Sequence, residues 1–186
     1  MAIVINGSGT VTGLAVGGLP DGTVDAGTLA TDSVTAAKLK DDAIAVGDLP
    51  AGSVLQVVST ASTTENTTTS TSFVTSGLTL SITPSATSSK IYISANFMGY
   101  NNTSTAITFY SLYRGSTELG GSSGMSLYRQ QDTADEEVIS MSYLDSPSST
   151  SALTYAVYFK VSSGTGYVNK GAGAMKGSIT VMEIAG

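Results

Sequence analysis

The chain has 186 residues, of which 41% are hydrophobic and only 12% charged, and its net charge is -6. It contains neither Cys nor His, which excludes disulfides, zinc–thiolate sites and the Ser-His-Asp triad. It also lacks a Lys/Arg cluster, which argues against nucleic-acid binding. The 28 Ser, 26 Thr and 21 Gly residues favour strands and turns over helices.

Residues 1–18 are predicted to contain a short β-element. Ile3, Val4 and Ile5 form a strand candidate, and the following Asn-Gly pair is a turn signal. A terminal strand of this kind can add to the sheet of another protein, and a frayed tail is the alternative. The segment lacks the basic and long apolar regions of a signal peptide, and no apolar run reaches the roughly 18 residues of a membrane span. We therefore expect neither secretion nor membrane insertion.

Residues 19–54 contain a decapeptide repeat. Its apolar positions alternate at intervals of five residues: Leu19, Val24, Leu29, Val34, Leu39, Ile44, Leu49 and Val54. Five residues rotate by about 500° on an α-helix and change the face on a strand, so no continuous element places them all on one side. Each unit must bend, and we expect an extended piece at the Val followed by a short helical turn, as over 35–39, with Thr35 as its N-cap.

Each decad offers two apolar side chains, which is too little burial to stabilise a single chain. Parallel copies around one axis solve this problem, because every Val and Leu then meets its own counterparts. The repeat therefore predicts a short fibrous stem, and a disordered low-complexity linker is the alternative.

Residues 55–186 alternate apolar and polar side chains in short runs separated by turn signals. The expected strands are 55–60, 72–75, 78–83, 90–100, 107–114, 125–131, 137–144, 154–161 and 178–184. Many short strands without a convincing helix predict a β-sandwich or jelly roll. The fold class is therefore mainly β: a stem of decads with short helical turns, followed by a sandwich domain.

The only carboxylate cluster falls between two expected strands and contains Asp132, Asp135, Glu136 and Glu137. Its spacing does not match an EF-hand, which requires Gly at the sixth position. A glycosidase needs two carboxylates that face each other across a cleft. We predict a solvated loop, with a calcium site and a catalytic pair as alternatives, and we expect no enzymatic activity, metal or cofactor.

Four residues at or near expected loop ends are candidates for receptor binding: Asn101, Asn102, Tyr113 and Tyr128. Tyr together with Ser, Gly and Asn is the composition of adaptable binding loops, and stacking on sugar rings is one use for the tyrosines. The alternative is that the tyrosine rings pack within the sandwich or between subunits, with their hydroxyls in water.

Three parts of the sequence resemble tail-fibre proteins of tailed bacteriophages. The run Ile5–Pro20 resembles the start of such fibres, and Asp32–Leu39 resembles their stem repeats. The segments Leu144–Pro147, Tyr155–Val157 and Ser178–Ile184 resemble their distal β-sandwich. The resemblance therefore touches both halves of the chain.

The resemblance implies a parallel homotrimer located in the virion tail and made in the host cytoplasm. Residues 1–18, with Ile3, Val4 and Ile5, would attach to a tail or baseplate protein. Residues 19–54 would form the stem, and 55–186 would bind a bacterial surface glycan or protein. The alternatives are a capsid or tail decoration protein and, in the enzyme class, a glycan depolymerase.

Overall fold

The computed structural model divides the chain into two units, 1–44 and 45–186. The residues that it describes are 31, 34–35, 39, 44–131, 136–171 and 175–186. The expected attachment residues Ile3, Val4 and Ile5 and the expected stem residues Leu19, Val24 and Leu29 lie outside this part of the chain. The following description therefore concerns the unit 45–186.

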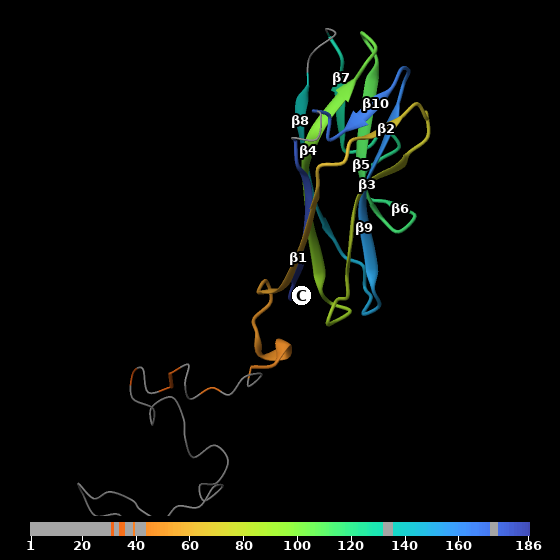
Figure 1. Ribbon diagram of the computed structural model, residues 1–186. Helices are drawn as coiled ribbons and strands as arrows, with labels where there is room; N and C mark the ends of the chain where they lie inside the picture. The colour runs from red at the N-terminus through yellow and green to blue at the C-terminus, as the bar shows by residue number, and fades with distance from the viewer. Residues whose placement is uncertain (1–30, 32–33, 36–38, 40–43, 132–135, 172–174) are drawn as a thin grey trace, which may run out of the picture. The chain divides into compact units, whose positions relative to one another are not determined.

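The described part of this unit is built almost entirely from antiparallel strands, preceded by a 3-10 turn, η2 (Val46–Asp48) (Figure 1). The strands are β1 (Val54–Ser62), β2 (Asn66–Thr68), β3 (Val74–Ile82), β4 (Lys90–Asn101), β5 (Ile107–Arg114), β6 (Thr117–Glu118), β7 (Ser126–Arg129), β8 (Glu137–Asp145), β9 (Leu153–Val161), β10 (Gly166–Val168) and β11 (Gly177–Ile184).

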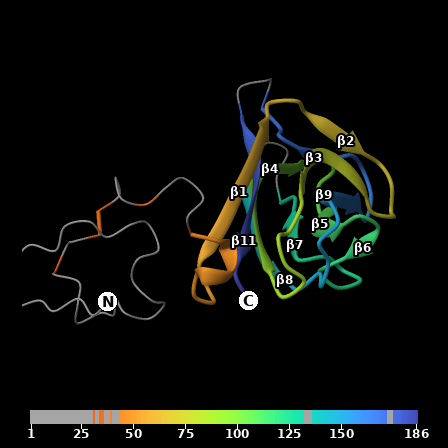
Figure 2. The ribbon, with the colours of Figure 1, turned by 90° about the horizontal axis from the view of Figure 1, so that it is seen from below.

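The strands form two sheets that face each other, as the end-on view shows (Figure 2). Sheet A has the order β1-β11-β4-β10-β2, with β8 also paired to β4, and sheet B has the order β3-β9-β5-β6, with β7 also paired to β5. The pairs are nested along the chain, because β1 pairs with β11, β3 with β9, β4 with β8, and β5 with β7. Nested antiparallel pairs divided between two sheets are the connectivity of a jelly roll, so the predicted sandwich is confirmed.

The core lies between the sheets because each long strand turns every second side chain inward. In β4, Ile91, Ile93 and Ala95 are fully buried. They meet inward residues of the opposite sheet, such as Leu112 and Val157, in one apolar cluster. Burial of about 25 cal/mol per Å² of apolar surface in such a cluster provides the main driving force for folding.

The expected strands agree with the observed ones, apart from the division of one strand and the omission of three short strands. Segments 72–75 and 78–83 belong to one strand, β3, which continues through a register irregularity at Gly77. Gly77 has φ of 81° and lies against the Asn66 side chain, so Gly is favoured there. The sequence analysis missed β2, β6 and β10, which are only two or three residues long.

The chain enters and leaves this unit at the same end. The Gly52 amide donates to the Ala185 carbonyl at 2.7 Å, and the Ala185 amide donates to the Ser53 carbonyl at 2.9 Å. We call this end proximal, and the opposite end, where β4 ends and β5 and β8 begin, distal (Figure 1). Val54, which the sequence analysis placed in the stem, is the first residue of β1.

The turn η2 occupies, in the third decad, the position that 35–39 has in the second. The Asp48 amide donates to the Ala45 carbonyl, and the Ala45 amide donates to the Asp48 carboxylate, both at 2.9 Å. These reciprocal bonds satisfy backbone groups that a single turn leaves unpaired. A short helical turn therefore forms at the expected place in this decad.

Candidate functional site

Asn101 links the loops at the distal end. It is the last residue of β4 and is fully buried. Its amide nitrogen donates to Thr108 Oγ1 and to the Ser163 carbonyl, both at 3.1 Å, and its oxygen accepts from the Thr103 amide at 3.0 Å. Because three segments share one buried carboxamide, the loops 102–106 and 162–165 are held in one arrangement.

Asn102 provides the second link between the same loops and is exposed. Its side-chain oxygen accepts from the Thr165 amide at 2.8 Å, and its own amide donates to the Thr165 carbonyl at 3.1 Å. Gly164, with φ of 71°, packs directly against Thr103, so a side chain there would collide with it. The resulting surface is rigid and polar, which suits recognition without reorganisation of the loops.

A hollow of about 260 Å³ opens near the start of β8 and the end of β7. It is lined by Tyr128, Arg129, Gln131, Glu136 and Glu137. Charges of both signs and an amide share this hollow, which makes it suitable for a polar ligand with several hydrogen-bonding groups. Asp132 and Asp135 of the expected acidic loop lie outside the described residues.

The outer face of sheet B carries a cluster of aromatic rings around Lys160. The rings of Tyr113 and Tyr158 stack with centroids 4.1 Å apart. The Lys160 ammonium lies 4.4 Å from the centroid of Phe73 and 5.5 Å from that of Phe109, within the range of cation–π attraction. Burial and the nearby Glu118 carboxylate raise the pKa of Tyr113 above its usual value, so its hydroxyl stays protonated at neutral pH.

The four candidate receptor residues differ in their exposure and in their position in the domain. Asn102 is exposed on a distal loop, as predicted. The placement of Asn101 and Tyr128 in accessible loops is wrong, because both side chains are buried. The Tyr128 hydroxyl donates to Gln130 Oε1 at 2.6 Å, so the ring serves as part of the core. Tyr113 lies on β5 near its proximal end, away from the other three.

Two buried ionic groups were missed at the sequence level. Asp145 accepts two hydrogen bonds from Arg114 Nη1, at 2.8 and 2.7 Å, and one from the Tyr155 hydroxyl at 2.7 Å. Glu183 is fully buried in β11. The burial of Glu183 could have been predicted from its position, because every second residue of a strand lies on the same face and Glu183 follows Ile179 and Val181 on the inward face.

Glu183 fixes the proximal end through neutral donors. Its Oε1 accepts from the Ser85 amide at 2.7 Å and from the Ser85 and Ser89 hydroxyls at 2.6 Å each, and its Oε2 accepts from Gln56 Nε2 at 2.6 Å. Burial raises the pKa of this carboxyl, but the hydrogen bonds outweigh burial and hold it below its usual value. The carboxylate therefore holds the loop 83–89 against β1 and β11.

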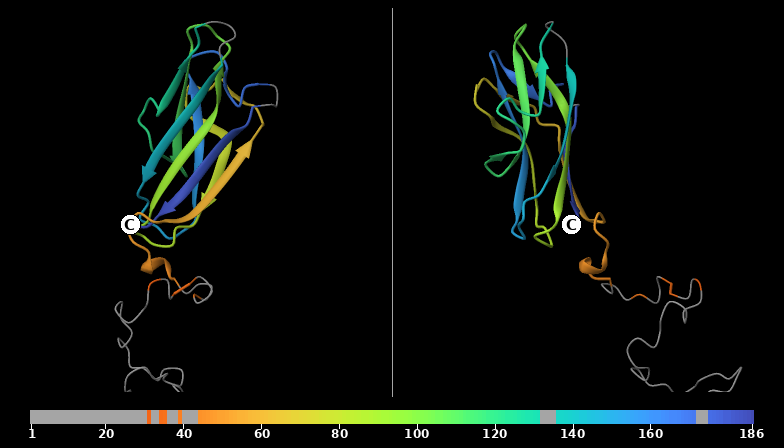
Figure 3. Two further views of the ribbon diagram at one scale, coloured as in Figure 1. Left: turned by 90° about the vertical axis from the view of Figure 1, so that its left-hand side faces the viewer. Right: turned by 180° about the vertical axis from the view of Figure 1, so that it is seen from behind.

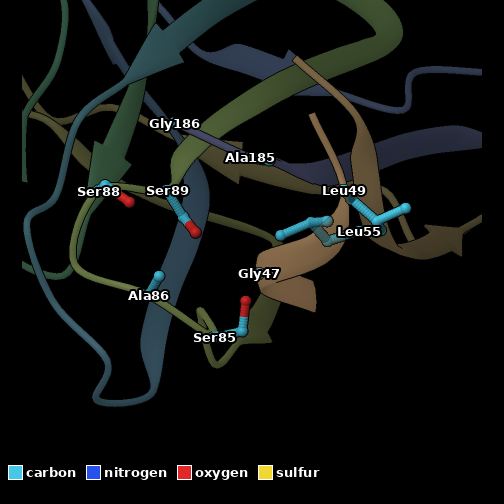
Figure 4. Close-up of a pocket in the computed structure, with 9 residues that line it drawn as sticks. All are labelled: Gly47, Leu49, Leu55, Ser85, Ala86, Ser88, Ser89, Ala185 and Gly186. Atoms are coloured by element: carbon cyan, nitrogen blue, oxygen red, sulfur yellow. The ribbon is translucent and has the colours of Figure 1, made fainter. Parts of the chain in front are cut away.

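Beside this network lies a second hollow of about 260 Å³, with Leu49 and Leu55 facing Ser85, Ser88 and Ser89 (Figure 4). The side chains that line it are apolar or carry hydroxyls, so the hollow offers shape and hydroxyl groups to a ligand.

Within the described ranges, no group of three or more acidic, His or Cys residues is placed to hold a metal ion. In the same part of the chain, no helix is long and apolar enough to cross a membrane.

A scan against protein-family models matches no family, and a search of curated proteins finds no match. Among solved structures, the chain is similar to the 2.6 Å structure of infectious bursal virus derived T=1 particles, with a TM-score of 0.45 and 8% identity over 70% of this chain and 32% of that chain. It is also similar to the crystal structure of the infectious bursal disease virus VP2 subviral particle, with a TM-score of 0.44 and 8% identity over 70% and 33% of the two chains. The chain spans about a third of the length of these proteins.

Proposed function

We propose that the chain is a virion structural protein of a tailed bacteriophage, a short homotrimeric tail fibre. Its N-terminal segment attaches to the tail or baseplate, its decads form the stem, and its jelly-roll domain binds a bacterial surface glycan or protein. The resemblance of the run 5–20 and of the decads to tail fibres supports this function. The proposal includes no catalytic step and no cofactor.

The observation that carries the proposal is a series of exposed apolar side chains at a fixed interval of five residues. The exposed fractions in this series are 53% for Val34, 44% for Leu39, 53% for Ile44, 38% for Leu49 and 54% for Val54. Single exposed apolar residues are ordinary, but a series at a fixed interval of five residues requires a partner with the same interval. A parallel copy of the chain supplies that partner.

The rigid distal loops support receptor binding at the end opposite the chain entry. Loops fixed by Asn101 and Asn102 lose little conformational entropy on binding. Three such ends on one trimer raise avidity even where each contact is weak. The aromatic cluster around Lys160 offers a second surface on each copy for sugar rings or protein.

The oligomeric mass of the purified protein and its location in the virion test the proposal together. Mass photometry of the purified full-length chain should give three times the monomer mass of 18.8 kDa, and antibody labelling of the virion should mark the tail. The purified protein should also block adsorption of the phage to its host. A monomer, or label on the head shell, contradicts a trimeric tail fibre.

A matched pair of variants tests the stem. Leu49→Asp places a charge in the exposed apolar series and should reduce the trimer fraction. Thr79→Asp places the same charge on the exposed outer face of sheet B and should leave the trimer intact. Equal behaviour of the two variants in sedimentation would argue against packing of the decads around an axis.

A capsid or tail decoration protein is the second candidate, and the nested jelly-roll pairing favours it, since this architecture occurs in viral capsid domains as well as in lectins. Labelling of the head shell would select it. A glycan depolymerase is the third candidate, and shortened host polysaccharide after incubation with the pure protein would establish it.

A further inference from the structure

The outer face of sheet A is sorted into rows by chemistry. In Figure 3 (left), β8, β4, β11 and β1 lie side by side on this face. The register places an apolar row across all four strands: Val57, Met182, Tyr92 and Leu144. The next row carries only hydroxyls: Ser59, Thr180, Ser94 and Ser142. The third row is small or polar: Ala61, Ser178, Asn96 and Ser140.

This face exposes large apolar side chains and no charge in these three rows. Val57 is 55% and Leu144 47% exposed, and Val138, which pairs with Met98 one row further along, is 63% exposed. The charge that β4 contributes to this face, Lys90, lies outside these rows at the proximal start of the strand. On the outer face of sheet B, Lys160 lies near the distal end of the central strand β9 and Arg129 lies on β7. A solvated sheet face normally carries polar side chains, so sheet A lacks a partner in the single chain.

We propose that the outer face of sheet A is the contact surface between copies of the jelly-roll domain, turned toward a common threefold axis. This inference rests on the proposed homotrimer and adds which face of the domain forms it. In a parallel arrangement, rows at the same height meet, so apolar side chains contact apolar ones and hydroxyls contact hydroxyls. A second copy fits the face better than a charged partner does, because the rows offer no charge to complement.

The area of the outer face of sheet A, and the exposed apolar residues that precede it along the chain, also support a second copy as its partner. Four strands spaced by about 4.8 Å and six residues rising about 3.4 Å each give a face of about 400 Å². A stable interface buries about 800 Å² per partner, so the face supplies about half. Leu49 and Val54, both exposed, precede the exposed Val57 along the chain that enters β1 and add to the apolar surface at the proximal end.

Single cysteines test the face directly, because the chain has no Cys of its own. Ser59 and Ser81 are matched positions: both are exposed, both lie on edge strands, and each hydroxyl bonds to a Thr on the neighbouring strand, at 2.8 and 2.9 Å. In the native full-length protein, the thiol of Ser59→Cys should react with a maleimide about tenfold more slowly than that of Ser81→Cys. In denaturant the two rates should agree.

The oligomeric mass of both variants, measured in the same buffer, separates the two proposals. A trimer in which both thiols react equally fast overturns the sheet A contact and leaves the trimeric fibre standing. A monomer overturns both. A trimer in which only the Ser81→Cys thiol is protected assigns the contact to sheet B instead.

A second pair of variants uses charge. Ser142→Lys would bring lysines from three copies together on sheet A, whereas Thr154→Lys places the same residue on the exposed face of sheet B. Ser142→Lys should lower the trimer fraction at low salt, with partial recovery at high salt. A trimer as stable as that of Thr154→Lys would contradict the proposed contact.

Discussion

Replacement of Glu183 by Gln tests whether the buried carboxylate, rather than its shape, holds the proximal end together. The carboxylate accepts four hydrogen bonds from neutral donors. Bonds to a charged acceptor contribute about 1.5–3 kcal/mol each and neutral ones about 0.5–1.5 kcal/mol, so four weakened bonds cost about 4 kcal/mol. Gln is cheaper to desolvate than a carboxylate, which returns part of this cost.

The net effect of Glu183→Gln should be a loss of about 2 kcal/mol of unfolding free energy. This loss includes the hydrogen bond from Gln56 Nε2 to Oε2, because an amide nitrogen placed at that position is a donor and cannot accept it. For a domain of this size, such a loss lowers Tm by about 4–8 °C. The assay is thermal unfolding of the full-length protein at pH 7 and at one protein concentration. Glu137→Gln, on the exposed start of β8, is the control and should shift Tm by less than about 2 °C.

The pH dependence of the Tm difference between wild type and Glu183→Gln provides the test that could refute this reasoning. The folded pKa of Glu183 lies below its usual value of 4.5, so the folded state favours the charged form. Its contribution is complete above pH 4.5 and is lost as pH falls through the folded pKa. The Tm gap between wild type and Glu183→Gln should therefore narrow in acid. A Tm difference at pH 7 no larger than that of the Glu137→Gln control would show that the charge of Glu183 stabilises nothing. A difference that stays constant from pH 7 down to pH 3 would show the same.

Three further outcomes follow from the structure. Asp145→Asn weakens the hydrogen bonds from Arg114 and Tyr155 and should cost about 2 kcal/mol in urea unfolding, since one side of the pair is partly solvated. Asn101→Ala removes three hydrogen bonds and should accelerate amide exchange in 102–106 and 162–165 while leaving the strands of sheet B unchanged. Glu136→Ala should leave adsorption within twofold of wild type if the exposed end of the acidic loop is only solvated, and a larger loss would place it in the receptor site.

The sandwich could be predicted from the sequence because its long strands follow the period of two. Every second residue from Ile91 to Phe97 is apolar, and the same alternation in 154–161 and 178–184 locates the strands that flank the core. The short strands β2 and β10 could not be found in this way. β10 pairs with β2 on one side and with the end of β4 on the other, over three residues each, so the position of both short strands is set by tertiary contacts rather than by a pattern of their own.

The candidate binding residues were harder to predict because loop ends and buried strand ends have the same composition. Asn101 and Asn102 are adjacent and identical, yet one is fully buried and the other is exposed. Asn101 continues the inward alternation of β4 to the end of the strand, whereas Asn102 lies beyond it, so the two carboxamides could be told apart only by knowing where the strand ends. The rows on the outer face of sheet A could not be predicted from the sequence either, because they depend on the register of four strands.

The scarcity of charge and the abundance of hydroxyls have a common structural consequence. In the proposed trimer each copy would carry a net charge of -6, so any carboxylate near the threefold axis would face two others at short range, where repulsion is weakly screened. Ser and Thr avoid this cost, since each hydroxyl both donates and accepts. The Ser59–Thr180 pair on β1 and β11 shows that such hydroxyls already satisfy one another within a copy, so the face can lose water on assembly without leaving an unpaired charge.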